Sequence, residues 1–297
     1  MSTEVARNKT APLEFKKPSQ AKEVWRRLKK DKLALFGLAT ITLFVLLAIF
    51  ADVIADYRLV TRINVHNRLQ LPSAEHWFGT DSYGRDLFAR CIHGARVSLS
   101  IGFLSALGAT IIGSLLGAMT GYIGGRFDNL VMRFFDIVSA IPPTLLALAV
   151  VAAMGPGAVK LGLALTFTNI PLFVRVVRSA VLGISGQEYI EACHAGGTSR
   201  WRIMIKHILP NAVGAVIIQS TLSVSHIIRS IATLSFLGLG INPPTPEWGA
   251  IISEARAYLR VAPTMMLFPA GMLSVTAFAI SVLGDGLRDA LDPRLKS

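Results

Sequence analysis

The sequence predicts an all-α membrane protein with six transmembrane helices. Of its 297 residues, 52% are hydrophobic and only 16% are charged, and the mean hydropathy is +0.53. This composition excludes a disordered chain and an ordinary soluble enzyme. The net charge of +12 comes from Lys and Arg at the ends of long apolar runs rather than on one face, so we predict no nucleic-acid partner.

Four uncharged intervals have the length of a membrane span. A helix needs about 20 apolar residues to cross a hydrocarbon core ~30 Å thick. The intervals hold 19 residues between Lys32 and Asp52, 29 between Arg96 and Arg126, 23 between Asp136 and Lys160, and 24 between Arg260 and Asp285.

The two remaining spans carry arginines. One runs for 14 residues from Leu161 to the residue before Arg175, so its helix must continue past Arg175 and Arg178, with their side chains snorkelling towards a polar surface. The other follows Lys206 and is predicted to be one long helix with Arg229 buried inside it. After a basic tail at 1–32, we therefore predict one membrane domain at 33–297, with spans at about 33–54, 97–122, 137–156, 160–180, 211–239 and 263–284.

The distribution of Lys and Arg predicts the orientation, because short cytoplasmic segments of membrane proteins are enriched in them. With both termini inside, the inner segments carry 20 of these residues and the outer segments carry 9, while Arg229 lies within a span. We therefore predict that both termini are cytoplasmic. The first span is longer than the apolar core of a signal peptide, so we interpret it as an uncleaved anchor.

Sequence motifs of catalysis are absent. None of the six histidines is followed by Glu, so there is no zincin-type helix that would hold Zn²⁺. There is no Gly-Lys dipeptide either, which excludes a phosphate-binding loop of the Gly-x-x-x-x-Gly-Lys type. We predict no catalytic residue, no metal site and no cofactor, and any ATP hydrolysis linked to this chain belongs to another polypeptide.

The inner segment at about 185–210 carries a distinctive motif. It reads Glu191-Ala192-Cys193-His194-Ala195-Gly196-Gly197, followed after nine residues by His207-Ile208-Leu209-Pro210. We predict a short helix from Gln187 to Cys193, ended by glycines that adopt positive φ, with Pro210 in the first turn of the next transmembrane helix. On spacing alone, an ordinary connection between two helices is an equal alternative.

This segment resembles the Glu-Ala-Ala loop of ATP-binding-cassette (ABC) importer permeases. The family pattern is Glu-Ala-Ala, a Gly six residues after the Glu, and a Leu-Pro whose Pro lies thirteen residues after that Gly. Cys193 replaces the second Ala, which is a mild departure because Cys packs much as Ala does. The matching positions that would contact an ATPase are Glu191, Ala192, Cys193, Gly197, Leu209 and Pro210.

Three further motifs resemble the second permease subunit of dipeptide and oligopeptide ABC importers. They are Gly79-Thr80-Asp81-Ser82-Tyr83-Gly84-Arg85-Asp86, the stretch from Leu234 through Pro243 to Gly249, and the stretch from Gly284 to Pro293. Each motif also has a structural interpretation. Asp81 or Ser82 would cap a helix, and Trp248 would sit in an outer turn at the membrane interface.

The resemblance implies a type I ABC importer permease fold with a cytoplasmic coupling helix, in a bacterial or archaeal cytoplasmic (inner) membrane. It implies four kinds of partner: a second homologous permease, two ABC ATPase subunits, an extracytoplasmic solute-binding protein and the lipid bilayer. Dipeptides or oligopeptides are the expected solutes, although glutathione and nickel chelates use similar permeases.

Arg229 departs from the family pattern and carries a separate hypothesis. A charge inside a span costs roughly 2.5–3.5 kcal/mol on insertion scales and usually faces a protein interior or a water-filled cavity. We expect Arg229, with Ser223 and His226, to face the translocation path and to attract a substrate carboxylate. The alternative is a salt bridge to the partner permease.

Two other classes of membrane protein remain as alternatives. An ion-coupled secondary transporter predicts paired intramembrane carboxylates or an inverted repeat, and the sequence shows neither. A membrane-embedded enzyme predicts a catalytic constellation, which the sequence also lacks.

Overall fold

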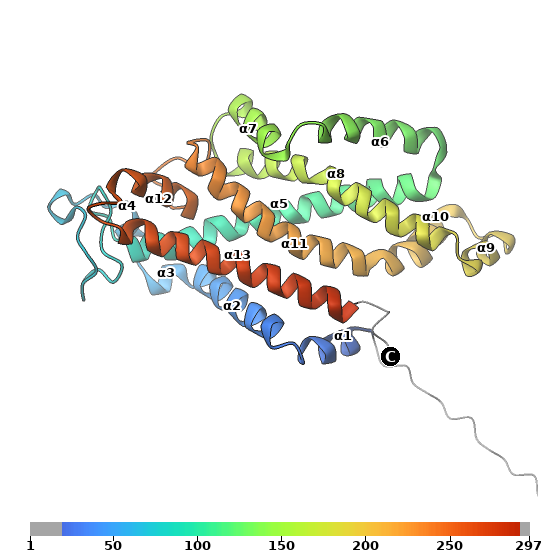
Figure 1. The fold of residues 1–297 in the computed structure, drawn as a ribbon, viewed down its shortest axis with the longest axis horizontal. Coiled ribbons are helices and arrows are strands. Elements are labelled where there is room, and N and C mark those ends of the chain that lie inside the picture. The colour runs from blue at the N-terminus through green and yellow to red at the C-terminus, as the bar shows by residue number, and fades with distance from the viewer. Residues whose placement is uncertain (1–19, 292–297) are drawn as a thin grey trace, which may run out of the picture.

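Long antiparallel helices form the bundle in the computed structural model, which describes residues 20–291 (Figure 1). Within that part of the chain, five helical runs are long and apolar enough to cross a membrane. They are α2 (Lys32–Ile49), α5 (Leu87–Ile123), α8 (Ala158–Ser185), the continuous run Arg200–Phe236 and α13 (Thr264–Leu291). A sixth span results if the bent pair of α6 (Gly125–Ser139) and α7 (Pro143–Met154) is counted as one.

Shorter helices lie at the two ends of the bundle. They are α1 (Gln20–Leu28), α3 (Ala51–Ile54), α4 (Tyr57–Thr61), η1 (Val65–Asn67), α9 (Glu188–Ala195), α12 (Trp248–Ala255) and η3 (Arg256–Tyr258). Figure 1 places α1, α9 and the last turn of α13 towards one end, and α3, α4 and α12 at the other. We call these the α9 end and the α12 end.

A stripe of glycines brings α5 against α8, the most extensive helix contact in the bundle. Gly113, Gly117 and Gly121 are spaced by four and therefore share one face of α5. A Cβ atom on Gly117 would lie 2.7 Å from the Val174 carbonyl oxygen, so a larger residue does not fit. Close backbone approach at small residues is a main source of helix association in membranes.

The third predicted span, 137–156, is not one continuous helix. α6 ends at Ser139, α7 begins at Pro143, and the two helices are bent by 85°. Two consecutive prolines cause the break. A residue that precedes proline is sterically excluded from the α region, and proline itself has no N–H to donate.

Ion pairs hold α6 to α8. The helix α8 continues past its two arginines as predicted, but both side chains pair with carboxylates of α6. Arg178 binds Asp128 through Nε and Nη2, each at 2.6 Å, and Arg175 Nη2 lies 3.0 Å from Asp136 Oδ1. Both arginine side chains remain partly exposed, Arg175 at 43% and Arg178 at 30%, so their snorkelling towards a polar surface stays a prediction.

The fifth span begins at Arg200 rather than at 211. It comprises α10 (Arg200–Ile203), the π-helical turn η2 (Met204–Ile208) and α11 (Leu209–Phe236). The Leu209 N–H bonds to the Met204 carbonyl oxygen, one residue further back than in an α-helix. This wider turn accommodates Pro210, which has no N–H, without ending the helix.

Candidate functional site

The short helix predicted in the inner segment is present as α9, and it protrudes at one end of the bundle (Figure 1). It begins after Gln187, whose backbone is extended, and ends at Ala195. Gly197 then adopts φ +74°, whereas Gly196 keeps φ −74°. The turn therefore requires the conformational freedom of glycine only at Gly197.

One buried side chain anchors α9 to three membrane helices. Ile190 is 1% exposed and packs in a cluster with residues of α5, α8, α10, η2 and α11, namely Ala118, Val177, Val181, Ile203, Met204, Ile208 and Ala212. Tight packing of this kind transmits displacement rather than absorbing it. The sequence motif did not identify Ile190. An apolar residue in an otherwise polar loop helix could have indicated that this side chain is buried.

Two polar contacts reinforce the anchor. The Asn211 Nδ2 atom donates to the Tyr189 hydroxyl at 3.1 Å, which joins α9 to α11. The Tyr122 hydroxyl lies 3.3 Å from His194 Nε2, which joins α9 to α5. A displacement of α9 therefore acts on both helices directly.

The predicted contact residues divide into two groups. Glu191, Ala192 and Gly197 are exposed, so they form a surface that a partner can reach. Cys193 and Leu209 pack against the Ile190 cluster instead. Pro210 is exposed at the start of α11.

A cavity of about 700 Å³ opens at the break between α6 and α7. It is bounded by these two helices, α8 and α11, and its polar lining residues are Ser139, Thr144, Thr168, Asn169, Arg175, His226, Ser230 and Thr233. Irregular backbone at membrane depth is tolerated where it lines a cavity. A cavity of this size with a few converging polar groups suits a small ligand.

The structure separates Ser223 from the other two residues expected on the translocation path. His226 is exposed and lines the cavity. Arg229 is exposed rather than buried, and its Nη1 donates to Ser225 Oγ at 2.7 Å. Ser223 is 1% exposed and accepts from the Gln219 amide at 3.2 Å, so it lies away from the open face. Within residues 20–291, Arg229 forms no ion pair.

The motif at 79–86 builds a buried ionic cluster at the α12 end. Asp81 Oδ2 accepts from Arg85 Nε and Arg90 Nη1, both at 2.6 Å, and Glu254 of α12 accepts from the same two arginines at 2.8 Å. Capping falls to Asp86, whose Oδ1 accepts from Ala89 N at 2.7 Å, and not to Asp81 or Ser82. The motif thus fastens the segment between α4 and α5 to α5 itself and to α12.

The motif that ends in Trp248 is also a packing element. Trp248 is fully buried, and its indole Nε1 donates to the Cys91 carbonyl at 3.0 Å. Glu247, also fully buried, caps α12 through Gly249 N and Ala250 N. Trp248 is therefore packed against α5 and does not face the lipid, contrary to the expectation of a Trp at the membrane interface.

Family models match most of the chain. Residues 113–297 match the binding-protein-dependent transport system inner membrane component, and residues 19–72 match the N-terminal transmembrane domain of oligopeptide transport permease C. The first match includes α9 and the cavity, and the second includes α1 and α2.

Similar proteins extend over nearly the whole chain. A dipeptide transport system permease protein, DppC, of Alkalihalophilus pseudofirmus is 46% identical over 276 residues, which cover 93% of this chain and 90% of the relative. Glutathione transport system permease proteins, GsiD, of Escherichia coli and Shigella boydii are 42% identical over 284 residues, 94% of either chain. The chain therefore belongs to the inner membrane components of binding-protein-dependent transport systems and is a permease of the peptide family of ABC importers.

Proposed function

We propose that this chain forms half of a transmembrane channel that an ATPase opens and closes through α9. The observation that carries the proposal is an exposed surface, formed by Glu191 and Ala192 of α9 and by Gly197 just after it, next to a buried Ile190 that fixes α9 to the bundle. The other components would be a second homologous permease, two ATPase subunits and an extracytoplasmic solute-binding protein. ATP hydrolysis would occur on the ATPase subunits.

The proposed orientation places the α9 end in the cytoplasm. The Lys and Arg distribution favours cytoplasmic termini, and α1 and the last turn of α13 lie towards the same end of the bundle as α9 (Figure 1). The α12 end would then face outwards, where a binding protein delivers solute.

Coupling would be mechanical. When nucleotide draws the ATPase subunits together, α9 moves, and the Ile190 cluster carries α5, α8 and α11 with it. Packed interfaces shift between discrete arrangements rather than deforming continuously. The channel would alternate between inward-open and outward-open states, with their populations set by the nucleotide.

We propose small peptides as the solutes. The relatives are named for dipeptide and glutathione transport, and such solutes carry free carboxylates. Arg175 and His226 line the cavity, and Arg229 is exposed three residues after His226 on α11. We propose that these groups attract the carboxylate of the solute, since cationic side chains recognise carboxylates through charge-assisted hydrogen bonds.

Replacing Arg229 by Leu tests its share of recognition. Uptake of anionic and zwitterionic peptides should fall, with normal assembly of the transporter. Unchanged uptake of every such substrate would remove Arg229 from the path. Lost copurification of the second permease, with uptake per assembled complex preserved, would indicate the alternative salt bridge.

Gly197→Asp tests the coupling helix. The substitution forces an L residue into positive φ, at a cost of about 1–2 kcal/mol, and adds charge to the exposed surface. We expect normal insertion, loss of binding-protein-stimulated ATPase activity, and uptake reduced at least tenfold. Gly186→Asp is the matched control, because Gly186 is also exposed at the entry to α9 but has φ −86°.

The outcomes discriminate clearly. Wild-type uptake and ATPase stimulation in Gly197→Asp would contradict the role of α9. Equal loss in both variants would assign the effect to charge alone.

Affinity purification of the tagged chain should bring down ATPase subunits. Solute import by the purified chain without them would favour the ion-coupled secondary transporter.

A further inference from the structure

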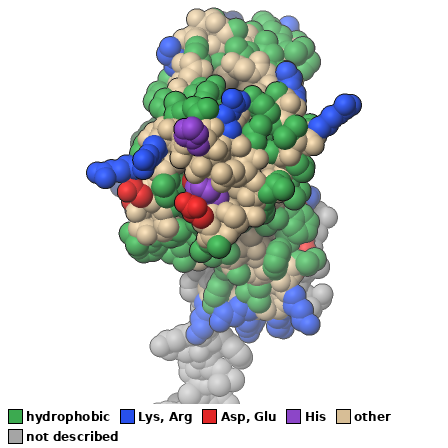
Figure 2. Space-filling view, turned by 90° about the vertical axis from the view of Figure 1, so that its left-hand side faces the viewer, with side chains coloured by type: hydrophobic (Ala, Val, Ile, Leu, Met, Phe, Trp, Pro, Cys, Tyr) green, Lys and Arg blue, Asp and Glu red, His purple; other side chains and the backbone are tan. Residues whose placement is uncertain are grey.

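The first helix carries an unusual concentration of unpaired positive charge. Two basic residues of α1 and three that follow it are exposed and form no ion pair within residues 20–291. They are Lys22 and Arg26 in the helix, and Lys29, Lys30 and Lys32 after it. Arg27 differs from them, because its Nη2 lies 2.9 Å from Glu23 Oε1. Figure 2 shows Lys and Arg side chains along the lower edge of the molecule, at the level where Figure 1 draws α1.

The apolar side of α1 fixes it at the point where the chain enters the membrane. Leu28 is 5% exposed and packs near Gly286 of α13. Trp25 is 45% exposed, with Lys29 Nζ 5.0 Å from the centre of its ring. Trp and Lys together are typical of the membrane interface. Lys32 begins α2, so α1 lies at the level of lipid headgroups.

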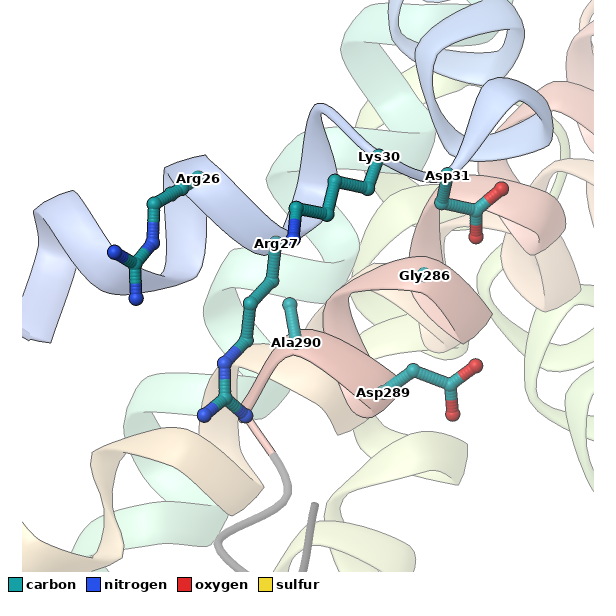
Figure 3. A pocket seen from close by; sticks show the side chains of 7 residues that line it. All are labelled: Arg26, Arg27, Lys30, Asp31, Gly286, Asp289 and Ala290. Atoms are coloured by element: carbon teal, nitrogen blue, oxygen red, sulfur yellow. The ribbon is translucent and has the colours of Figure 1, made fainter. Parts of the chain in front are cut away.

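A crevice of about 330 Å³ separates α1 from the end of α13. Its lining residues are Arg26, Arg27, Lys30, Asp31, Gly286, Asp289 and Ala290. Figure 3 shows Arg26, Arg27 and Lys30 on α1 and the turn after it, Asp31 at the start of α2, and Asp289 on α13, with both carboxylates directed away from the two guanidinium groups. The crevice thus offers cationic and anionic groups to one ligand.

The two carboxylates of the crevice come from different elements: Asp31 precedes α2, and Asp289 belongs to α13. Asp31 Oδ1 caps α2 by accepting from Leu33 N and Ala34 N, so it is held in place. A Cβ on Gly286 would lie 2.4 Å from Ala34 Cβ. Because Gly286 has no side chain, α13 approaches α2 closely, and Asp289 lines the same crevice as the basic residues.

We propose that this crevice binds the headgroup of an anionic phospholipid with headgroup hydroxyls, such as phosphatidylglycerol. The phosphate is bound by Arg26 of α1 and by Lys30 in the turn after that helix, and the hydroxyls of the headgroup donate to Asp31 and Asp289. The surplus of exposed cations around the crevice favours a lipid with net negative charge. That this lipid belongs to the cytoplasmic leaflet rests on the orientation proposed above, but the binding itself does not.

Native mass spectrometry of the purified full-length chain tests the site. Delipidated protein is titrated with phosphatidylglycerol or phosphatidylethanolamine, and the first bound lipid is quantified. The double variant Arg26→Gln/Lys30→Gln removes two charges from the crevice, and Lys22→Gln/Lys29→Gln removes two charges from α1 and the turn after it, outside the crevice lining. The charge-conserving variant Arg26→Lys/Lys30→Arg controls for loss of structure.

We expect Arg26→Gln/Lys30→Gln to lower the affinity for phosphatidylglycerol roughly tenfold or more. Lys22→Gln/Lys29→Gln should change this affinity less than about twofold, and the charge-conserving variant should bind the lipid nearly as the wild type does. An equal loss of phosphatidylglycerol affinity in the two neutralised variants would show that the lipid is attracted by the overall positive charge and not by the crevice, and it would overturn the proposal. Equal affinity of the wild-type chain for phosphatidylethanolamine would overturn the anionic specificity. Neither result depends on transport, so failure here leaves the proposed function standing.

Discussion

The buried ionic cluster at the α12 end provides the sharpest test of the packing. Asp81 is fully buried and accepts four hydrogen bonds, from the backbone N–H groups of Tyr83 and Arg85 and from the guanidinium groups of Arg85 and Arg90. Asp81→Asn preserves the shape of the side chain. It turns one acceptor into a donor that faces two guanidinium groups, and it leaves their positive charge compensated by Glu254 alone.

The expected cost follows from burial. Removing one partner of a buried ion pair costs about 3–5 kcal/mol, because the remaining charge is left uncompensated. Glu254 still contacts both arginines at 2.8 Å, so we expect the lower end, about 3 kcal/mol. At roughly 2 °C of melting temperature per kcal/mol for a chain of this size, the transition should fall by about 6 °C.

Fluorescence-detected size-exclusion chromatography of heated samples measures this shift in the assembled transporter. Asp56→Asn is the matched control, because exposed Asp56 of the same outer segment only caps α4, and Asn caps helices equally well. Adding Arg85→Gln to Asp81→Asn should recover part of the loss by removing the surplus charge. A melting temperature within 1 °C of wild type for Asp81→Asn would refute the reasoning.

Substitutions at three further contacts are tested by the same melting assay. Trp248→Phe should destabilise by about 1–3 kcal/mol through its lost indole hydrogen bond, and Trp248→Ala by about 3–5 kcal/mol through the cavity it leaves; equal melting of the two variants would contradict the burial of this side chain. Gly117→Ala places a methyl group 2.7 Å from a backbone oxygen of α8 and should cost about 1–3 kcal/mol, whereas Gly214→Ala, with open space around its Cβ, should be neutral or stabilising. Asp128→Asn breaks the ion pair with Arg178, whose side chains are 13% and 30% exposed, and should cost about 1 kcal/mol; a loss that does not shrink in high salt would argue against a screened surface pair.

The local sequence pattern was sufficient to predict α9, but not to predict which helices α9 packs against. Small residues followed by a glycine pair predict a short helix and its end, because both depend only on neighbours in the chain. The anchoring of Ile190 depends on α5, α8 and α11 meeting at one point. The glycines on α5, by contrast, recur every four residues in the sequence, a spacing that could have predicted close helix packing.

The separation of buried Ser223 from exposed His226 and Arg229 shows a second limit. All three lie on one helix, and their positions around its axis follow from the 3.6-residue period. Which part of that circumference faces the cavity is set by the placement of α7 and α8. The bend between α6 and α7, which creates the cavity, follows from Pro142 and Pro143, but the 85° angle depends on packing.

The sequence by itself determined the membrane class, the approximate position of five long helices, and the family. The reason is that hydrocarbon offers no hydrogen-bond partners, so a long apolar run must satisfy its own backbone as a helix. Tertiary structure alone decided that Trp248 is buried and that Arg90 meets Glu254, 164 residues away. Such contacts depend on how separate helices pack, and hydropathy and spacing describe each helix only along its own axis.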